Sequence, residues 1–286
     1  MVKLLKRNKK IVIGGTVILI YAILTLLAPV IAPYGFDQMR SGPFLQGPNW
    51  DALFHPAEGT TVHLMGTDNY GRDILTRVLY GGQTSLGLPL LATVIAMCVG
   101  IALGSLSGFI GGKFDAIVMR VADVLTSIPW IMMAIIITAI LGAGPTVVVL
   151  SMGVTHAPEV MRIMRGEAVS IREREYVEAA YAVGERPSGV LTRYVLPNST
   201  ATIIVQATLI FSKCIIMESA ISYCGYGVQP PNPSWGLLLA HSQQYMWEAA
   251  YYALFPGVVI VLIVLAVNLF GDGLRDELDP KFNGKR

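Results

Sequence analysis

Long apolar stretches alternate with short polar segments along the whole chain. A helix needs about 20 apolar residues to cross the hydrocarbon core of a bilayer. Runs near that length occur at Ile11–Ile31, Leu86–Ile110, Ile117–Leu141, Pro145–Ile163, Ala201–Cys224 and Tyr252–Phe270. The pattern predicts an all-α polytopic membrane protein with six transmembrane helices, of which the fourth is interrupted by His156 and Glu159.

The composition agrees with a membrane protein. The chain is 53% hydrophobic and 14% charged, whereas soluble domains carry about 25% charged residues. Its net charge of +2 is too small to indicate nucleic-acid binding, so the lipid bilayer is the expected surrounding. Cys98, Cys214 and Cys224 lie far apart and form no Cys-x-x-Cys pair, which argues against zinc and dithiol chemistry.

The first apolar run follows a basic N-terminus and allows two interpretations. A signal peptide has an apolar region of about 7–15 residues, and this run is longer, so we interpret it as an uncleaved anchor. Basic residues gather on the cytoplasmic side of membrane proteins. With the N-terminus in the cytoplasm, only Arg40, Arg72 and Arg77 fall in outside loops, and the C-terminus is cytoplasmic too.

Three regions follow from this topology. Residues 1–31 hold the cytoplasmic N-terminus and the first transmembrane helix. Residues 32–85 form an extracytoplasmic segment that ends in an interfacial helix, since apolar residues recur at helical spacing from Leu75 to Tyr80. Residues 86–286 form a core of five transmembrane helices, with a cytoplasmic loop at 164–200.

The outside segment contains Gly66-Thr67-Asp68 and Gly71-Arg72-Asp73 just before the expected interfacial helix. Aspartates in such a pattern either bind a cation or form turns and cap helices. We expect turns and caps here.

Several ionisable residues fall inside predicted spans, where charges are costly and commonly functional. Lys213 and Glu218 stand five residues apart, a poor spacing for pairing, and are candidates to line a translocation path. A partner elsewhere in the bundle is the alternative for Lys213. His156 and Glu159 share a helix face and are further candidates. A metal site would need more ligands, and His55, His63 and His241 fall outside the membrane, so none is predicted.

Small residues and a proline shape the second and third spans. Gly100, Gly104 and Gly108 line one helix face and predict a packing seam, within the chain or against a second membrane-spanning chain. Arg120 and Asp123 are spaced for an ion pair. Pro129 predicts a kink in the third span.

The cytoplasmic loop at 164–200 carries helix signals. Ser170 and Glu173 fit a capping box, and Gly184 fits the position that follows a helix C-terminus. These predict a helix from Arg172 to Val183, then a turn and a second short helix ahead of Leu196-Pro197.

The same loop resembles the EAA loop of ATP-binding-cassette importer permeases. The matching residues are Glu178, Ala179, Ala180, Gly184, Leu196 and Pro197, while Tyr194 stands where the family usually has Ile. The segments from Gly225 to Gly236 and from Gly271 to Pro280 resemble the second permease subunit of dipeptide, oligopeptide and nickel importers. The resemblance covers roughly residues 60–282. It implies the type I ABC importer permease fold.

The resemblance also implies how the protein works. The six loop residues would couple the chain to an ATPase. The implied partners are a second homologous permease, two ABC ATPase subunits and an extracytoplasmic substrate-binding protein. No phosphate-binding loop occurs in the sequence, so we expect no catalytic residues and no cofactor in this chain, with ATP and Mg in the partners. Gln229, Pro230, Pro231 and Trp235 are candidates for an extracytoplasmic gate or for docking of the binding protein, or else form a rigid connector.

The substrate follows from the resemblance alone. Small peptides are expected, with nickel or metal chelates, glutathione or another small solute as alternatives. A stand-alone secondary transporter or channel is the remote alternative, which would be expected to carry inverted repeats and paired intramembrane charges. The expected location is a bacterial or archaeal cell membrane.

Overall fold

The computed structural model describes residues 8–54 and 61–278, and its regular elements there are helical apart from one isolated bridge between Thr67 and Asp73. The helices are α2 (Lys9–Leu26), α3 (Ala28–Ile31), α4 (Asp51–Phe54), α5 (Ile74–Ile110), α6 (Gly112–Ser127), α7 (Trp130–Leu141), α8 (Pro145–Arg172), α9 (Glu175–Ala182), α10 (Pro187–Val190), α11 (Leu196–Asn198), α12 (Thr200–Tyr223), α13 (Trp235–Ser242) and α14 (Ala250–Leu278). A π-helical turn at Leu191–Val195 joins α10 to α11, and a 3₁₀ turn at Gln243–Tyr245 follows α13.

Five of the described helices, α2, α5, α8, α12 and α14, are long and apolar enough to cross a membrane. The number is six when α6 and α7 count as one span, because these two helices meet at an angle of 91°. The break falls at Pro129, where a kink was predicted. Its size shows that the third span is interrupted rather than gently bent.

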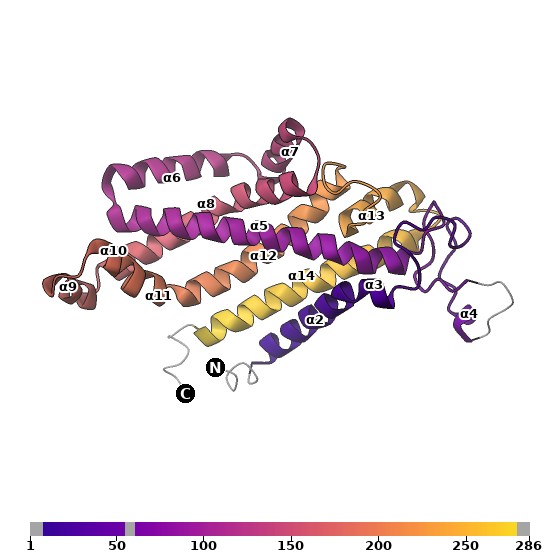
Figure 1. Ribbon diagram of the computed structural model, residues 1–286, viewed down its shortest axis with the longest axis horizontal. Coiled ribbons are helices and arrows are strands. Elements are labelled where there is room, and N and C mark those ends of the chain that lie inside the picture. Colours follow the sequence, from indigo (N-terminus) through magenta and orange to yellow (C-terminus); the bar gives the residue numbers. More distant parts are fainter. Residues whose placement is uncertain (1–7, 55–60, 279–286) are drawn as a thin grey trace.

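The long helices run along one axis and separate the two ends of the molecule (Figure 1). The segment α9–α11 lies at one end, and α2 begins and α14 ends on that side, where Lys10 Nζ lies 2.8 Å from Asp276 Oδ2. The loops before α5 and helix α13 lie at the other end. This arrangement agrees with the topology predicted from the basic residues. The terminal charges Lys3, Lys6, Arg7, Lys281, Lys285 and Arg286, together with His55 and Asp279-Pro280, lie outside the described residues.

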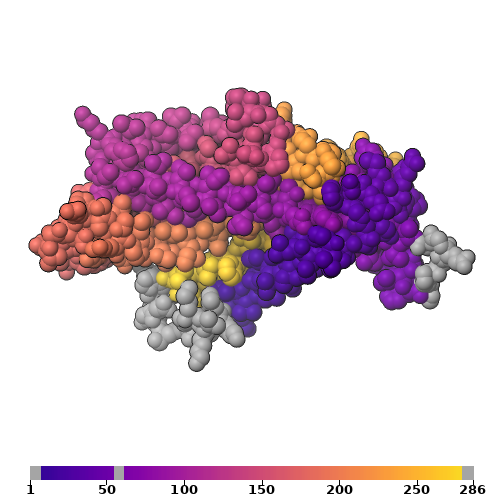
Figure 2. Space-filling model, in the orientation of Figure 1, coloured from indigo at the N-terminus to yellow at the C-terminus, as the bar shows by residue number. Residues whose placement is uncertain are grey.

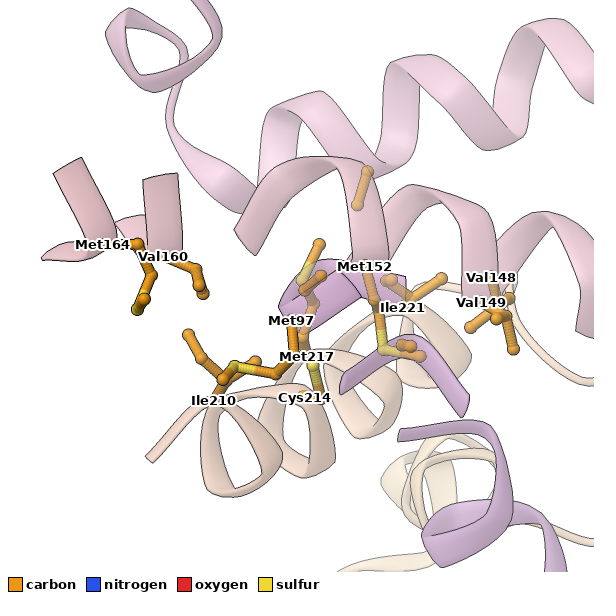
Figure 3. Packing of buried hydrophobic residues seen from close by; sticks show 13 residues of the cluster. Met97, Val148, Val149, Met152, Val160, Met164, Ile210, Cys214, Met217 and Ile221 are labelled. Atoms are coloured by element: carbon orange, nitrogen blue, oxygen red, sulfur yellow. The ribbon is translucent and has the colours of Figure 1, made fainter. Parts of the chain in front are cut away.

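The largest buried cluster lies between α5, α8 and α12 (Figure 3). Met97, Met152, Val160, Ile210 and Cys214 belong to it. The outer faces of the bundle expose large apolar side chains, including Leu19, Leu90, Ile140 and Leu265. A bilayer would cover such surfaces, since lipid tails are as apolar as the side chains themselves.

The predicted glycine seam lies inside the chain, between α5 and α8. A methyl group added at Gly100 would overlap Val160, and one at Gly104 would overlap the backbone of Met161. A methyl at Gly108 would meet the carbonyl of Arg165. These three positions therefore let the two helix backbones approach closely, as small residues do between membrane helices.

The interfacial helix that was predicted as a separate element is part of α5. The helix runs without interruption from Ile74 to Ile110, so residue 85 marks no structural boundary. The aspartates act as turn and cap residues, as predicted. Asp73 Oδ2 accepts from the backbone N–H of Thr76 at 2.8 Å, and Asp68 Oδ1 accepts from the N–H groups of Tyr70 and Arg72.

Candidate functional site

The cytoplasmic loop forms the short helix α9, which projects beyond the long helices (Figure 2). The predicted capping box is wrong. Ser170 lies within α8, which continues to Arg172, and α9 starts at Glu175 without a side-chain cap. Burial of Ile171 against Phe109 favours the longer α8. Glu175 and Glu178 occupy the first turn of α9, where the positive end of the helix dipole stabilises negative side chains.

Helix α9 ends at Ala182, and Gly184 follows its C-terminus as predicted. The residue has a φ of +88°, which L-amino acids with a side chain rarely adopt. The N–H of Gly184 donates to the carbonyl of Tyr181, and the N–H of Glu185 donates to that of Ala180, each at 3.0 Å. This is the hydrogen-bond pattern of a Schellman motif, and it turns the chain sharply at the tip of the loop.

One face of α9 packs on the bundle and the other faces outwards. Val177 is buried in a cluster with Phe109, Ala168 and Val195, and Ala180 is 4% exposed. Glu178, Ala179, Gly184 and Pro197 are exposed, and Leu196 is half-buried. Val183 at the tip of the loop is 85% exposed, which is unusual for an apolar side chain outside the membrane. The carboxylate of Glu178 makes no hydrogen bond or ion pair among the described residues. The outward surface of the loop thus combines short and apolar side chains with charged ones such as Arg174, Glu175 and Glu178.

A second cluster lies at mid-span, where three of the four intramembrane candidates meet. Lys213 Nζ on α12 donates to both carboxylate oxygens of Glu159 on α8, each at 2.7 Å. Gln206 Nε2 also donates to Glu159, at 3.2 Å. His156 stands one turn before Glu159 and is 8% exposed. Lys213 therefore has a partner within the bundle, which was the alternative to a role in lining a path. Such a pair was also expected of a secondary transporter, so the pair alone does not separate the two classes.

A cavity of about 480 Å³ lies beside this cluster. His156, Glu159 and Lys213 line it together with Pro129 and Trp130, at the break between α6 and α7. Its remaining lining comes from Leu125, Thr126, Ile128, Thr155 and Ile216.

The fourth candidate, Glu218, lies apart from this cavity. It is fully buried, and Ser222 Oγ donates to its Oε1 at 2.7 Å. Ser85 of α5 and Ser234 ahead of α13 lie beside the same carboxyl group. Its position indicates a polar tie between α12, α5 and α13 rather than a surface that a solute could reach in this conformation.

The four gate and docking candidates lie after α12 and differ in their exposure. Gln229, Pro230 and Pro231 are exposed, and the amide of Gln229 donates to the carbonyls of Gly225 and Gly227. Trp235 is 1% exposed and offers no surface to a binding protein, contrary to its prediction as a docking residue. Its indole N–H donates to the carbonyl of Val78 at 2.9 Å, and its backbone N–H donates to Ser85 Oγ at 3.0 Å. Trp235 therefore anchors α13 to α5.

Replacing Trp235 by alanine should destabilise the subunit by about 3–5 kcal/mol, because truncation of a buried aromatic leaves a cavity. Thermal unfolding of the purified protein in detergent measures the effect. Trp247 is 99% exposed and serves as the matched control, with no change expected for Trp247→Ala. Equal melting temperatures for the two variants would show that the anchor is unimportant.

Polar contacts elsewhere differ from expectation or were missed. Asp123 pairs with Arg162 of α8 at 2.9 Å rather than with Arg120. Arg165 makes two hydrogen bonds to Asp115, both at 2.6 Å. Gln206 was not identified as part of the mid-span cluster. Its spacing of seven residues from Lys213, which places both on one helix face, was the signal that could have found it.

Within residues 8–54 and 61–278, no group of three or more His, Cys, Asp or Glu side chains is placed to hold a metal ion. In α13, burial lowers the pKa of His241, and the nearby charges of Arg72 and Arg77 lower it further. This imidazole is therefore neutral near pH 7.

Comparisons with known proteins agree with this architecture. The model of the binding-protein-dependent transport system inner membrane component matches residues 100–284, and the N-terminal TM domain of oligopeptide transport permease C matches residues 1–48. The fold resembles that of a chain in an inward-facing structure of the MetNI methionine ABC transporter, with a TM-score of 0.61 and 17% identity over 72% of this chain and 98% of that chain. That likeness confirms the ABC importer permease fold.

Relatives are similar over nearly the whole chain. The dipeptide transport system permease protein DppC of Alkalihalophilus pseudofirmus is 37% identical over 98% of this chain and 88% of its own length. The di/tripeptide transport system permease protein DppC of Pseudomonas aeruginosa is 38% identical over 96% and 89%. The glutathione transport system permease protein GsiD of Pectobacterium atrosepticum is 34% identical over 96% and 88%. The chain belongs to the family of binding-protein-dependent transport system inner membrane components.

Proposed function

We propose that this protein is a permease subunit of an ATP-driven ABC importer and forms half of the translocation pathway for small peptides. The observation that carries the proposal is the 37–38% identity, over 96–98% of the chain, to permeases named for dipeptide and di/tripeptide transport. A further relative is named for the transport of glutathione, which is also a short peptide. The metal-chelate, channel and secondary-transporter alternatives receive no comparable support.

The working assembly would contain a second homologous permease, two ABC ATPase subunits and an extracytoplasmic binding protein. ATP and Mg would bind in the ATPase subunits, because the sequence of this chain contains no phosphate-binding loop. The assembly would lie in the inner membrane of a bacterium. The relatives reported above are bacterial and lend the archaeal alternative no support.

Helix α9 is the proposed contact with an ATPase subunit. Glu178, Ala179, Gly184 and Pro197 lie on exposed parts of the loop, while Ala180 and the half-buried Leu196 hold it to the bundle. Val177 packs against the ends of α8 and α5, and Arg172 Nη1 donates to the carbonyl of Phe109 at 2.8 Å. A displacement of α9 would thus be passed directly to two transmembrane helices. ATP binding would favour the state that opens outwards, by binding more tightly to that state than to the other.

The outside loop at Gln229, Pro230 and Pro231 is the proposed contact with the binding protein or the outer gate. It lies at the end of the molecule opposite α9, and its exposed prolines form a stiff surface with few backbone donors.

Deletion of the gene in a strain that needs a supplied amino acid tests the function. The deletion strain should fail to grow when that amino acid is provided as a dipeptide, and the restored gene should rescue growth. A tagged chain should purify with a second permease and ATPase subunits. Recovery of the chain alone, active in transport without an ATPase, would refute the proposal.

A further inference from the structure

The Lys213–Glu159 ion pair lies in the middle of the bundle and yet remains open on one side. Lys213 is near the midpoint of α12, and Glu159 is near the midpoint of α8. Their side chains are 48% and 37% exposed in the isolated chain. Charges at this depth are too costly to leave in contact with lipid tails, so they face a partner chain or a water-filled path.

A cavity beside the ion pair favours a water-filled path over a partner chain. The cavity of about 480 Å³ falls within the range of small-molecule pockets. Pro129 and Trp130 at the start of α7 line it, and the first N–H groups of a helix give it a positive end. Interrupted membrane helices place such ends at substrate sites in other transporters. The start of α7 and Lys213 both favour a carboxylate, and Glu159 favours an ammonium group.

His156 supplies an independent observation. It is 8% exposed, lines the cavity, and its Nε2 is buried without a hydrogen-bond partner among the described residues. Buried polar atoms in native proteins usually have a partner. A structural tie between α8 and α12 would need the ion pair but would not need this unpartnered nitrogen beside it.

We propose that this cavity is a binding station for the zwitterionic backbone of a short peptide during translocation. Glu159 receives the terminal ammonium, and Lys213 and the start of α7 receive the terminal carboxylate. The lining carries one positive and one negative charge, which matches a ligand of zero net charge. This inference rests on the proposed function and adds the residues that select the substrate.

The test uses the complete transporter, with its partner subunits, in proteoliposomes supplied with binding protein and dialanine. Glu159→Gln and Lys213→Gln should each lower ATP-driven uptake by about tenfold, the size expected when one charged contact is lost. Co-purification of the partner subunits should stay unchanged. Asp123→Asn is the matched control, since it breaks a different ion pair, between α6 and α8, whose Asp123 does not line this cavity, and its uptake should remain near that of the wild type.

The exchanged pair, Glu159→Lys with Lys213→Glu, separates binding from structure. It restores the attraction between α8 and α12 but reverses the charges relative to α7 and His156, so uptake should stay low. Recovery of uptake in the exchanged pair would overturn the inference and identify a structural tie. Ile216→Trp, which fills the cavity and leaves the charges in place, should also lower uptake, and wild-type uptake in that variant would overturn the inference even if the charge variants fail to assemble. If the wild-type complex takes up no dialanine, the proposed function fails as well.

Discussion

Gly184→Arg should abolish ATP-driven uptake while the subunit still folds and inserts. The backbone at Gly184 is left-handed, with φ of +88°, and nothing lies within 4 Å of an added Cβ. An arginine there would strain the backbone by about 1–2 kcal/mol, which a folded subunit can tolerate. The long charged side chain would then stand at the tip that is proposed to enter the ATPase, and would block that contact.

Two further substitutions separate strain from size at this tip. Gly184→Asn keeps a small residue that tolerates the left-handed conformation, so it should retain most of the uptake. Gly112→Arg is the matched control, because Gly112 also has a positive φ, +61°, and open surroundings on the same side of the bundle. Uptake in proteoliposomes and co-purification of the ATPase are the measurements. Wild-type uptake in Gly184→Arg would place the coupling contact elsewhere.

Gly104→Val should prevent the subunit from folding stably. An added Cβ would lie 2.8 Å from the Cα and 3.0 Å from the carbonyl carbon of Met161, and these backbone atoms cannot move aside as a flexible side chain would. Helices α5 and α8 would have to separate, and the main buried cluster lies between them. Overpacking of this kind costs about 1–3 kcal/mol, occasionally more, and the backbone contact places Gly104 at the upper end.

Gly87→Val is the control for this prediction. Gly87 lies on the same helix, and nothing lies within 4 Å of its added Cβ. Size-exclusion profiles and melting temperatures in detergent should be near the wild type for Gly87→Val, whereas Gly104→Val should aggregate or melt at a much lower temperature. Equal behaviour of the two variants would mean that α5 and α8 do not need close backbone contact.

Features that depend on one stretch of chain could be predicted from the sequence. The apolar runs identified the membrane helices because a bilayer sets their length. The end of α9 was predicted because Gly184 suits a left-handed backbone, and the start of α5 depends on the cap that Asp73 provides. The family resemblance came from a loop whose residues stand at fixed spacing.

Features that depend on packing between distant segments were missed or misplaced. The Ser170–Glu173 capping box failed because burial of Ile171 keeps that segment in α8. Glu159 and Lys213 are 54 residues apart, so their pairing requires the tertiary arrangement of α8 and α12. Trp235 was predicted as a gate or docking residue from its place in the proline-rich outside segment, while its own side chain reaches back to Val78.

Helix α5 has a mechanical consequence. Its 37 residues make a rod about 55 Å long, well beyond the roughly 30 Å of the hydrocarbon core. Its N-terminus is capped by Asp73 in the outer loops, and its C-terminal end lies beside Arg172 near α9. A single stiff lever therefore links the two ends of the molecule, so that a tilt produced at the end near α9, the proposed ATPase contact, would arrive reversed in direction at the outer loops, the proposed contact with the binding protein.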